Sequence, residues 1–222
     1  MRYSIITPTL CRPTLKRLCD SIDVQSNDSW EHIIVTDGVV TPMRQAILDS
    51  IKKDPRRKIV ACSRLNHPRN FGNFARREAY DLTSGEYVCQ IDDDDYYADA
   101  DVLRTLECVT GVWAIYPVLA RGKREHRDPP GIGLTGSAMF IYRRDTGIKF
   151  PDNCDYSADG QVVEALKKKY PYQALSKVRP LVIYPWANHG MSQEEIDQRF
   201  ANRPQRIKYA KDGLTIDWTD RG

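Results

Sequence analysis

Four consecutive aspartates, Asp92 to Asp95, follow an apolar run at 87–91 and precede two tyrosines. Two carboxylates about 6 Å apart repel each other by roughly 3 kcal/mol at an effective dielectric of about 20. A solvated acidic turn is one explanation for such a run. However, the apolar segment before it has the pattern of a buried strand, and ligands of α/β proteins bind at the ends of such strands. The position therefore favours a site that holds a cation.

The spacing of the acidic residues excludes an EF-hand calcium loop. Such a loop needs glycine at position 6 and glutamate at position 12, and counting from Asp92 these positions are Tyr97 and Leu103. Mg²⁺ and Mn²⁺ instead bind through one or two carboxylates together with the phosphates of a substrate. The pattern therefore predicts a metal-bound diphosphate as the ligand.

The elements that must position the aspartates alternate between two hydrophobic periods. Short apolar runs rich in β-branched residues predict strands at 3–7, 32–37, 58–62 and 87–92. Helical patterns lie between them, at 12–25, 41–53 and 73–85. Repeated strand–helix units of this kind predict an α/β fold with a doubly wound, mostly parallel sheet.

The second half of the chain has a mixed pattern. Strands are predicted at 113–119, 137–144 and 180–185, and helices at 101–109, at 157–170 from about Ala158, and in the tail at 186–203. A charged loop rich in proline and glycine fills 121–135. We expect one domain over 1–222, made of a nucleotide-binding half (1–98), an acceptor-side half (99–192) and a C-terminal tail (193–222).

Composition is that of a globular protein, with 41% hydrophobic and 28% charged residues. A net charge of +3 is too small to indicate nucleic acid, and the six cysteines contain no CxxC pair, so we expect reduced thiols. No signal peptide and no apolar stretch near the roughly 20 residues of a membrane span is evident. We expect a cytoplasmic protein without a transmembrane segment; peripheral membrane attachment through the basic segment 203–211 is an open alternative.

Six segments, taken in order, resemble the inverting nucleotide-sugar glycosyltransferases of the GT-A fold, in particular glycosyltransferase family 2. They are "SIITPT" (4–9), "IIVTDG" (33–38), "NFGNFARREA" (70–79), "GEYVCQIDDDD" (85–95), "TGSAMFIYRR" (135–144) and "SADGQVVEAL" (157–166). The resemblance covers about residues 2 to 192 and implies a GT-A fold with a mixed C-terminal part. The aspartate run looks like the Asp-x-Asp motif of that family.

The resemblance also implies a donor site. Its nucleotide-binding residues would be Thr7, Pro8, Asp37, Arg76, Asp92 and Asp93, with Asp37 holding the base. Its metal ligands would be Asp94 and Asp92, with Asp93 and Asp95 as alternatives, and a late loop would bring His189 to the diphosphate or the metal. Arg77 replaces the Asn that follows the arginine in the family. The cofactor expected is a divalent ion, Mn²⁺ or Mg²⁺.

On the acceptor side, the resemblance implies that Thr135, Gly136 and Ser137 line a pocket wall. It also implies that Asp159 is the general base, although Ala158 stands where the family usually has Glu. A capping acid at the start of a helix is the alternative for Asp159. The segment 131–136 is a literal GxGxxG, but a proline-rich stretch precedes it and a strand pattern follows it, which excludes a dinucleotide loop.

These observations predict a metal-dependent inverting glycosyltransferase that moves a sugar from a nucleotide diphosphate sugar, such as a UDP-sugar, to an acceptor hydroxyl. The acceptor could be a glycan, a lipid, a protein or a small molecule. One alternative is a non-catalytic nucleotide-sugar or glycan-binding domain of the same fold. Another is a sugar-phosphate nucleotidyltransferase, which would be expected to have a glycine-rich loop after the first strand, where "TPTLCRPT" has no glycine.

Overall fold

The computed structural model describes residues 1–51, 53–64, 72–120, 122–152 and 157–184, and the backbone of 207–210 and 213–216. The chain divides into two compact units, Met1–Tyr184 and Pro185–Gly222. In the second unit, β12 (Ile207–Ala210) pairs with β13 (Gly213–Ile216) in antiparallel fashion. The predicted tail helix at 186–203 lies outside the described residues.

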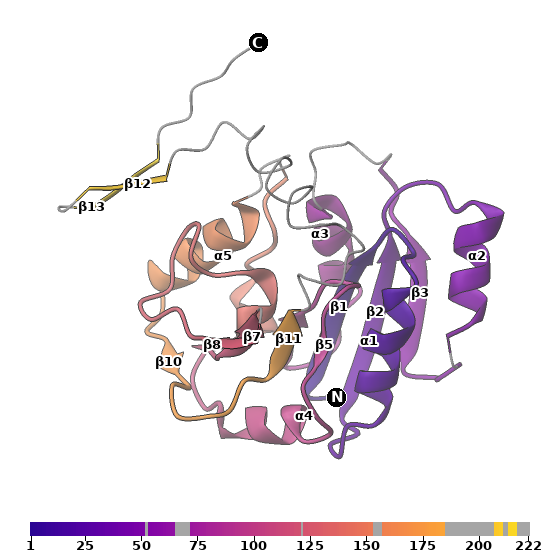
Figure 1. Ribbon diagram of the computed structural model, residues 1–222, viewed down its shortest axis with the longest axis horizontal. Coiled ribbons are helices and arrows are strands. Elements are labelled where there is room, and N and C mark those ends of the chain that lie inside the picture. Colours follow the sequence, from indigo (N-terminus) through magenta and orange to yellow (C-terminus); the bar gives the residue numbers. More distant parts are fainter. Residues whose placement is uncertain are drawn as a thin grey trace, which may run out of the picture. The chain divides into compact units, whose positions relative to one another are not determined.

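Strands and helices alternate through the first part of the larger unit. They are β1 (Tyr3–Thr9), α1 (Thr14–Asp23), β2 (Trp30–Thr36), α2 (Pro42–Asp49), β3 (Arg57–Ala61), α3 (Asn73–Asp81) and β4 (Tyr87–Gln90). The remaining strands and α-helices are β5 (Tyr96–Tyr97), α4 (Val102–Thr105), β6 (Trp113–Ile115), β7 (Val118–Ala120), β8 (Lys123–Glu125), β9 (Phe140–Arg143), α5 (Ala158–Lys167), β10 (Gln173–Ala174) and β11 (Val182–Tyr184). Three short 3-10 helices are η1 (Leu106–Cys108), η2 (Ser137–Met139) and η3 (Arg144–Thr146). The predicted α/β alternation is confirmed (Figure 1).

The main sheet has seven strands in the order β10-β6-β9-β4-β1-β2-β3. The four strands from β4 to β3 run parallel, whereas β9 is antiparallel to both β4 and β6. The sheet is therefore parallel on its N-terminal side and mixed on the other, as the sequence predicts. No described helix is both long and apolar enough to cross a membrane.

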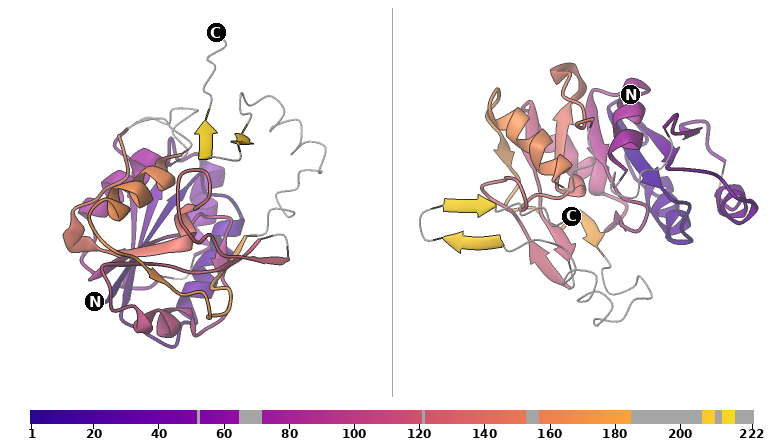
Figure 2. Two further views of the ribbon diagram at one scale, coloured as in Figure 1. Left: turned by 90° about the vertical axis from the view of Figure 1, so that its left-hand side faces the viewer. Right: turned by 90° about the horizontal axis from the view of Figure 1, so that it is seen from above.

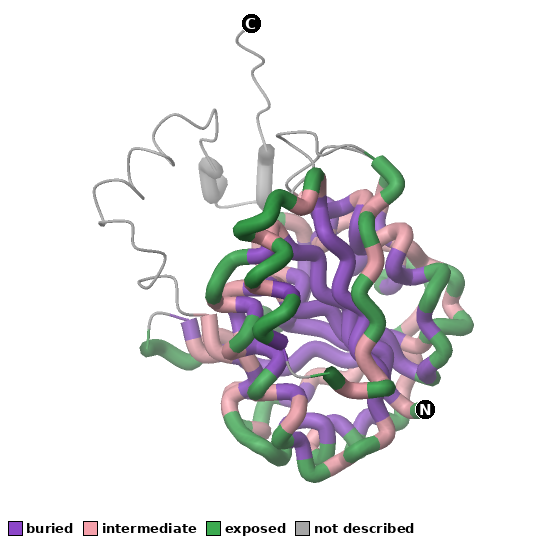
Figure 3. The backbone as a smooth tube through the Cα atoms, turned by 90° about the vertical axis from the view of Figure 1, so that its right-hand side faces the viewer, coloured by how far each residue is buried: buried purple, intermediate pink, exposed green. Residues whose placement is uncertain are grey.

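Helices lie on both faces of this sheet (Figure 2). An apolar layer covers each face. Side chains alternate along β1, so Tyr3 and Ile5 pack on the α1 face and Ile6 packs on the α3 and α5 face. Helix α1 buries residues at helical spacing, Leu15, Leu18, Cys19 and Ile22. The strands form the buried centre (Figure 3). Each fully buried aliphatic side chain contributes about 1.5–3 kcal/mol to the stability of this core.

The predicted single strand at 113–119 is wrong in one respect. The chain leaves the main sheet after β6 and enters a second sheet with β7, and the break falls at Tyr116 and Pro117. Proline has no N–H to donate to a ladder, which favours a break there. The second sheet has the order β5-β11-β7-β8, so the predicted strand at 180–185 belongs to it as β11, and the predicted loop 121–135 contains β8.

A buried carboxylate joins the N-terminal ends of three neighbouring strands. Oε1 of Glu31 accepts hydrogen bonds from the hydroxyl of Ser4 at 2.7 Å, from the backbone and hydroxyl of Ser84 at 2.5 and 2.8 Å, and from the N–H of Gly85 at 3.2 Å. Lys58 Nζ lies 3.2 Å from its other oxygen. Hydrogen bonds that favour the charged form outweigh burial, so the pKa of Glu31 is lowered.

We predict that Glu31→Gln destabilises the protein by about 1–3 kcal/mol at pH 7, because charge-assisted hydrogen bonds to a buried acceptor are lost. The folded pKa of Glu31 is lower than its unfolded value, so its stabilisation is present above about pH 4.5 and is lost as pH falls further. Urea unfolding of both proteins from pH 7 to pH 3 measures this. The exposed Glu86→Gln is the matched control; a difference between wild type and Glu31→Gln that does not shrink at low pH contradicts the prediction.

Candidate active site

The carboxyl ends of β1, β2 and β4 meet at one edge of the main sheet, because these strands are parallel neighbours. The N–H of Asp37 donates to the carbonyl of Thr9 at 2.8 Å, and the N–H of Ile91 donates to the carbonyl of Ile6 at 3.0 Å. This edge therefore carries Asp37, the loop between β1 and α1, and the aspartate run. It is the edge at which α/β proteins bind ligands.

The four aspartates are not equivalent. Carboxylate oxygens of Asp92, Asp94 and Asp95 lie within 4.8 Å of one another, and Asp93 is not part of this group. Clustered carboxylates are the oxygen ligands that Mg²⁺ and Mn²⁺ prefer. The donor set of Asp92, Asp94 and Asp95 thus fits a hard divalent ion. Of the two alternative metal ligands named from the sequence, Asp95 belongs to the group and Asp93 does not.

Asp93 instead fixes the loop that follows β1. Its Oδ2 accepts the hydroxyl of Thr9 at 2.5 Å and the N–H of Leu10 at 3.2 Å, and the same hydroxyl accepts the N–H of Cys11 at 2.7 Å. Cys11 has a positive φ of 56°, which is uncommon outside glycine. Burial raises the pKa of Asp93 to about 6. This carboxylate is a structural residue of the β1–α1 loop.

Two arginines neutralise the aspartate run from opposite ends. Arg12, in the β1–α1 loop, forms an ion pair with Asp94, and its Nη1 lies 3.4 Å from Oδ1 of Asp93. Arg76, on α3, forms an ion pair with Asp92. Opposite charges at these distances offset much of the repulsion within the run. The crowding of the carboxylates is therefore relieved by the protein itself.

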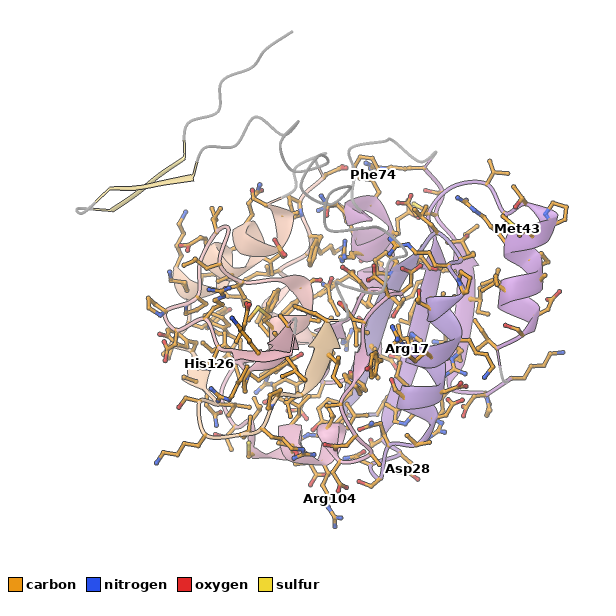
Figure 4. All side chains as sticks on the ribbon, viewed as in Figure 1. Arg17, Asp28, Met43, Phe74, Arg104 and His126 are labelled. Carbon is orange, nitrogen blue, oxygen red and sulfur yellow. The ribbon has the colours of Figure 1, made fainter. Side chains whose placement is uncertain are left out.

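A third arginine supports the same segment from α1. Nη2 of Arg17 donates to the backbone carbonyl of Asp94 at 3.0 Å, and its guanidinium lies 4.2 Å from the ring centre of Tyr96 (Figure 4). Cation–π contacts of this kind contribute about 0.5–2 kcal/mol. Arg17 thus holds the turn between the aspartates and β5 against the helix.

Asp95 is the least exposed member of the acidic group: it is buried, whereas Asp92 and Asp94 are half-buried. Its pKa is raised well above its usual value, first by burial and then by the negative charges of Asp92 and Asp94. A carboxyl in these surroundings is stabilised as a carboxylate by any cation placed within the group. The electrostatics of the site therefore favour cation binding there.

Asp159 stands in the first turn of α5 and shares the electrostatic environment of the acidic group. The N–H of Gly160 donates to its Oδ1 at 2.8 Å. Burial raises the pKa of Asp159 to about 6, while the charge of Arg76 lowers it and that of Asp92 raises it. A carboxyl with this pKa is ionised at pH 7 and still basic enough to accept a proton.

The residues around Asp159 explain its local sequence. Ala158 is buried in the apolar layer with Val162, so a glutamate at this position would have to be desolvated. A Cβ atom on Gly160 would lie 2.6 Å from the Cα of Ile132. Glycine at 160 therefore allows α5 to approach the 131–133 loop closely.

Gly72 allows α3 to begin against the end of β1. It has φ +76°, and a Cβ there would lie 2.8 Å from Cβ of Pro8 and 3.1 Å from Nη1 of Arg76. Pro8 is buried in this contact. The close approach sets the position of Arg76 beside the aspartate run.

Two other residues carry fold contacts that the sequence does not reveal. Thr7 is fully enclosed, and its hydroxyl lies 3.0 Å from Nε2 of His32. Arg77, which replaces the family's Asn, donates through Nη1 to the carbonyl of Phe150 at 2.8 Å. The side chains of Thr7 and Arg77 thus join neighbouring elements of the fold, and the nucleotide role of Thr7 stays a prediction.

Of the three predicted acceptor-side residues, Gly136 lies against Tyr184, the last residue of β11, while Thr135 and Ser137 are buried. A Cβ on Gly136 would lie 3.1 Å from the Tyr184 hydroxyl. The pKa of Tyr184 is raised well above its usual value by burial and then by the charge of Asp95. The tyrosine is therefore close to Gly136 and within electrostatic reach of Asp95.

Sequence reasoning missed Arg12 and Tyr184. Arg12 had a usable signal, because it stands in the loop directly after a strand that ends at the ligand-binding edge of the sheet. Tyr184 had none, since only the pairing of β11 in the second sheet brings it to the site. His189, the predicted further ligand, lies outside the described residues.

We predict that Asp93→Ala destabilises the protein by about 2 kcal/mol, because the Leu10 N–H and the Thr9 hydroxyl lose a buried acceptor. Thermal unfolding in EDTA should show a Tm lower by several degrees. Asp94→Ala is the matched control: it removes a carboxylate beside Asp95, so its effect should be less than half as large. Equal losses of Tm in the two variants would contradict the structural role of Asp93.

The sequence and the architecture are similar to those of known proteins. The family model "Glycosyl transferase family 2" matches residues 4–157. The structure of S. aureus TarS 1-349 in complex with UDP-GlcNAc aligns with a TM-score of 0.66 and 18% identity, over 83% of this chain and 58% of that one. The mannosyltransferase PcManGT from Pyrobaculum calidifontis, in complex with GDP-Man and Mn²⁺, aligns with a TM-score of 0.60 and 17% identity, over 85% and 58%.

This chain thus spans less than two thirds of the length of these solved chains. No curated protein sequence matches it. The structural likenesses show the GT-A fold, and the family model covers more than half of the sequence. The protein therefore belongs to glycosyl transferase family 2.

Proposed function

We propose that the protein is a metal-dependent, inverting glycosyltransferase that transfers a sugar from a nucleotide diphosphate sugar to an acceptor hydroxyl, with a UDP-sugar as the expected donor. The observation that carries the proposal is the combination of a carboxylate group that fits a divalent ion with a separate carboxylate, Asp159, that interacts electrostatically with Asp92 of that group. Two structural relatives are complexes with nucleotide sugars, UDP-GlcNAc and GDP-Man, and the second also contains Mn²⁺.

The acidic group supports the donor side of this proposal. Asp92, Asp94 and Asp95 would hold the ion, and a divalent ion there supplies positive charge that stabilises a departing diphosphate. Asp37 at the end of β2 is the expected partner of the base. His189 remains the predicted further ligand, outside the described residues.

Asp159 supports the acceptor side. Its carboxylate accepts the proton of the acceptor hydroxyl while the oxygen of that hydroxyl forms a bond to the anomeric carbon. The bond between that carbon and the diphosphate oxygen breaks in the same step, and its electron pair leaves with the nucleoside diphosphate. A single displacement inverts the anomeric centre and requires no covalent intermediate with the protein.

A binding screen followed by a turnover assay tests the function. UDP-GlcNAc, GDP-Man and other nucleotide sugars are screened with Mn²⁺ by thermal shift, since a cognate donor stabilises the folded state by mass action. Metal-dependent release of nucleoside diphosphate is then measured. We predict that Asp159→Asn lowers this release by about 10²–10⁴-fold, the usual contribution of a general base.

The affinity of Asp159→Asn for the donor should stay within about twofold, because the amide oxygen can still accept the N–H of Gly160. Glu164→Gln, on the same helix, is the matched control and should turn over normally. Normal release by Asp159→Asn contradicts the assigned role. Donor binding without release by the wild type would identify a binding domain instead of an enzyme.

A further prediction concerns how kcat/KM depends on pH. Protonated Asp159 cannot accept a proton, so kcat/KM should fall tenfold per pH unit below a pKa of about 6 and should level off above it. A bound divalent ion can only move this midpoint downward, because positive charge favours the carboxylate. Values of kcat/KM measured from pH 4.5 to 8 show this fall in activity. If the residual activity of Asp159→Asn falls with pH in the same way, the titrating group is not Asp159.

A further inference from the structure

Arg12 is a charged side chain at the site to which neither the family motif nor the proposed mechanism gives a role. Its guanidinium forms an ion pair with Asp94, one of the three carboxylates of the acidic group. Its side chain is 43% exposed, whereas that of Arg76, which pairs with Asp92, is only 6% exposed. The two arginines therefore differ in how easily they can leave their carboxylates.

We propose that Arg12 is an exchangeable counter-ion. It occupies Asp94 when no donor is bound, yields that carboxylate to the divalent ion, and then binds the diphosphate of the donor. This proposal rests on the proposed function and assigns to its site a residue that contacts the phosphates.

The first step follows from competition for one carboxylate. Asp94 belongs to the group that fits a divalent ion, and the guanidinium of Arg12 already contacts its Oδ2. A guanidinium and a divalent ion at the same carboxylate repel each other strongly at such short distances. Binding of the ion therefore favours departure of Arg12 from Asp94.

The second step follows from the structure of the β1–α1 loop, in which the backbone is anchored and the side chain of Arg12 is exposed. Asp93 anchors the backbone through Thr9 and Leu10, and Pro13 restricts φ immediately after Arg12. The long side chain can therefore turn without displacement of the loop. Arg76 is different, because its guanidinium lies 5.3 Å from the ring centre of Phe150 and is enclosed.

The third step follows from the chemistry of the ligand. A diphosphate bound to an ion in the acidic group brings anionic oxygens next to the place that Arg12 leaves. The planar guanidinium can donate two parallel hydrogen bonds to a phosphate group. The released side chain therefore binds the diphosphate in preference to water. The guanidinium of Arg12 thus changes partner, from the carboxylate of Asp94 to the phosphates.

Two titrations of the full chain test this exchange. The first measures the Kd of Mn²⁺ alone by calorimetry, and we expect Arg12→Gln to bind at least about threefold more tightly than wild type because the competitor is gone. The second measures the Kd of UDP, or of GDP if the screen selects it, in saturating Mn²⁺. Here Arg12→Gln should bind at least about threefold more weakly.

Matched variants separate exchange from a general effect of charge. Arg44→Gln removes the same charge near the same loop, since Arg44 acts on the pKa of Cys11, but its Nη1 donates to the carbonyl of Val39. It should change neither Kd by more than about twofold. Arg12→Lys keeps the charge and loses the planar fork, so Mn²⁺ affinity should stay near wild type while nucleotide affinity falls.

The opposite signs of the two shifts are what the proposal requires. Unchanged Mn²⁺ affinity in Arg12→Gln, or an equal change in Arg44→Gln, overturns it. Tighter binding of both Mn²⁺ and nucleotide also overturns it, because Arg12 would then be only a competitor. Failure of the wild type and of Arg12→Gln to bind Mn²⁺ would instead overturn the metal site of the proposed function, and this exchange with it.

Discussion

The site depends on the compensation of charge along four adjacent aspartates. The run is placed at the end of a buried strand, where unrelieved repulsion would oppose folding, and arginines from three separate segments surround it. Arg12, Arg17 and Arg76 come from the β1–α1 loop, from α1 and from α3. The same interactions that permit the acidic group to exist therefore also tie the first half of the fold to it.

The four aspartates differ in the interactions that they make. Asp93 is turned inward and holds the loop after β1, while its neighbours form the group that suits a divalent ion. A run of identical residues conceals this division, because alternate backbone directions in a turn give each carboxylate different surroundings. The bonding of Asp93 therefore distinguishes it from its three neighbours, which the motif alone does not do.

Hydrophobic periodicity was sufficient to predict the parallel core, because strands buried on both faces and amphipathic helices leave strong local patterns. The second sheet was not predictable in this way. Its strands are two or three residues long and pair with partners far away in the chain, as β11 does with β5 and β7. The family resemblance indicated Asp92, Asp94 and Asp159 from local segments of sequence, whereas the position of Tyr184 depends on that long-range pairing.

Pro117 lies where the chain passes from one sheet to the other, with β6 before it and β7 after it. Because β11 bridges β7 and β5, the strand that succeeds the aspartates is linked by hydrogen bonds to the strand that introduces the 121–135 segment. A change of sequence within 121–135 is therefore constrained to preserve β8, which lies inside that segment, because β8 and β11 are the two strands that pair with β7.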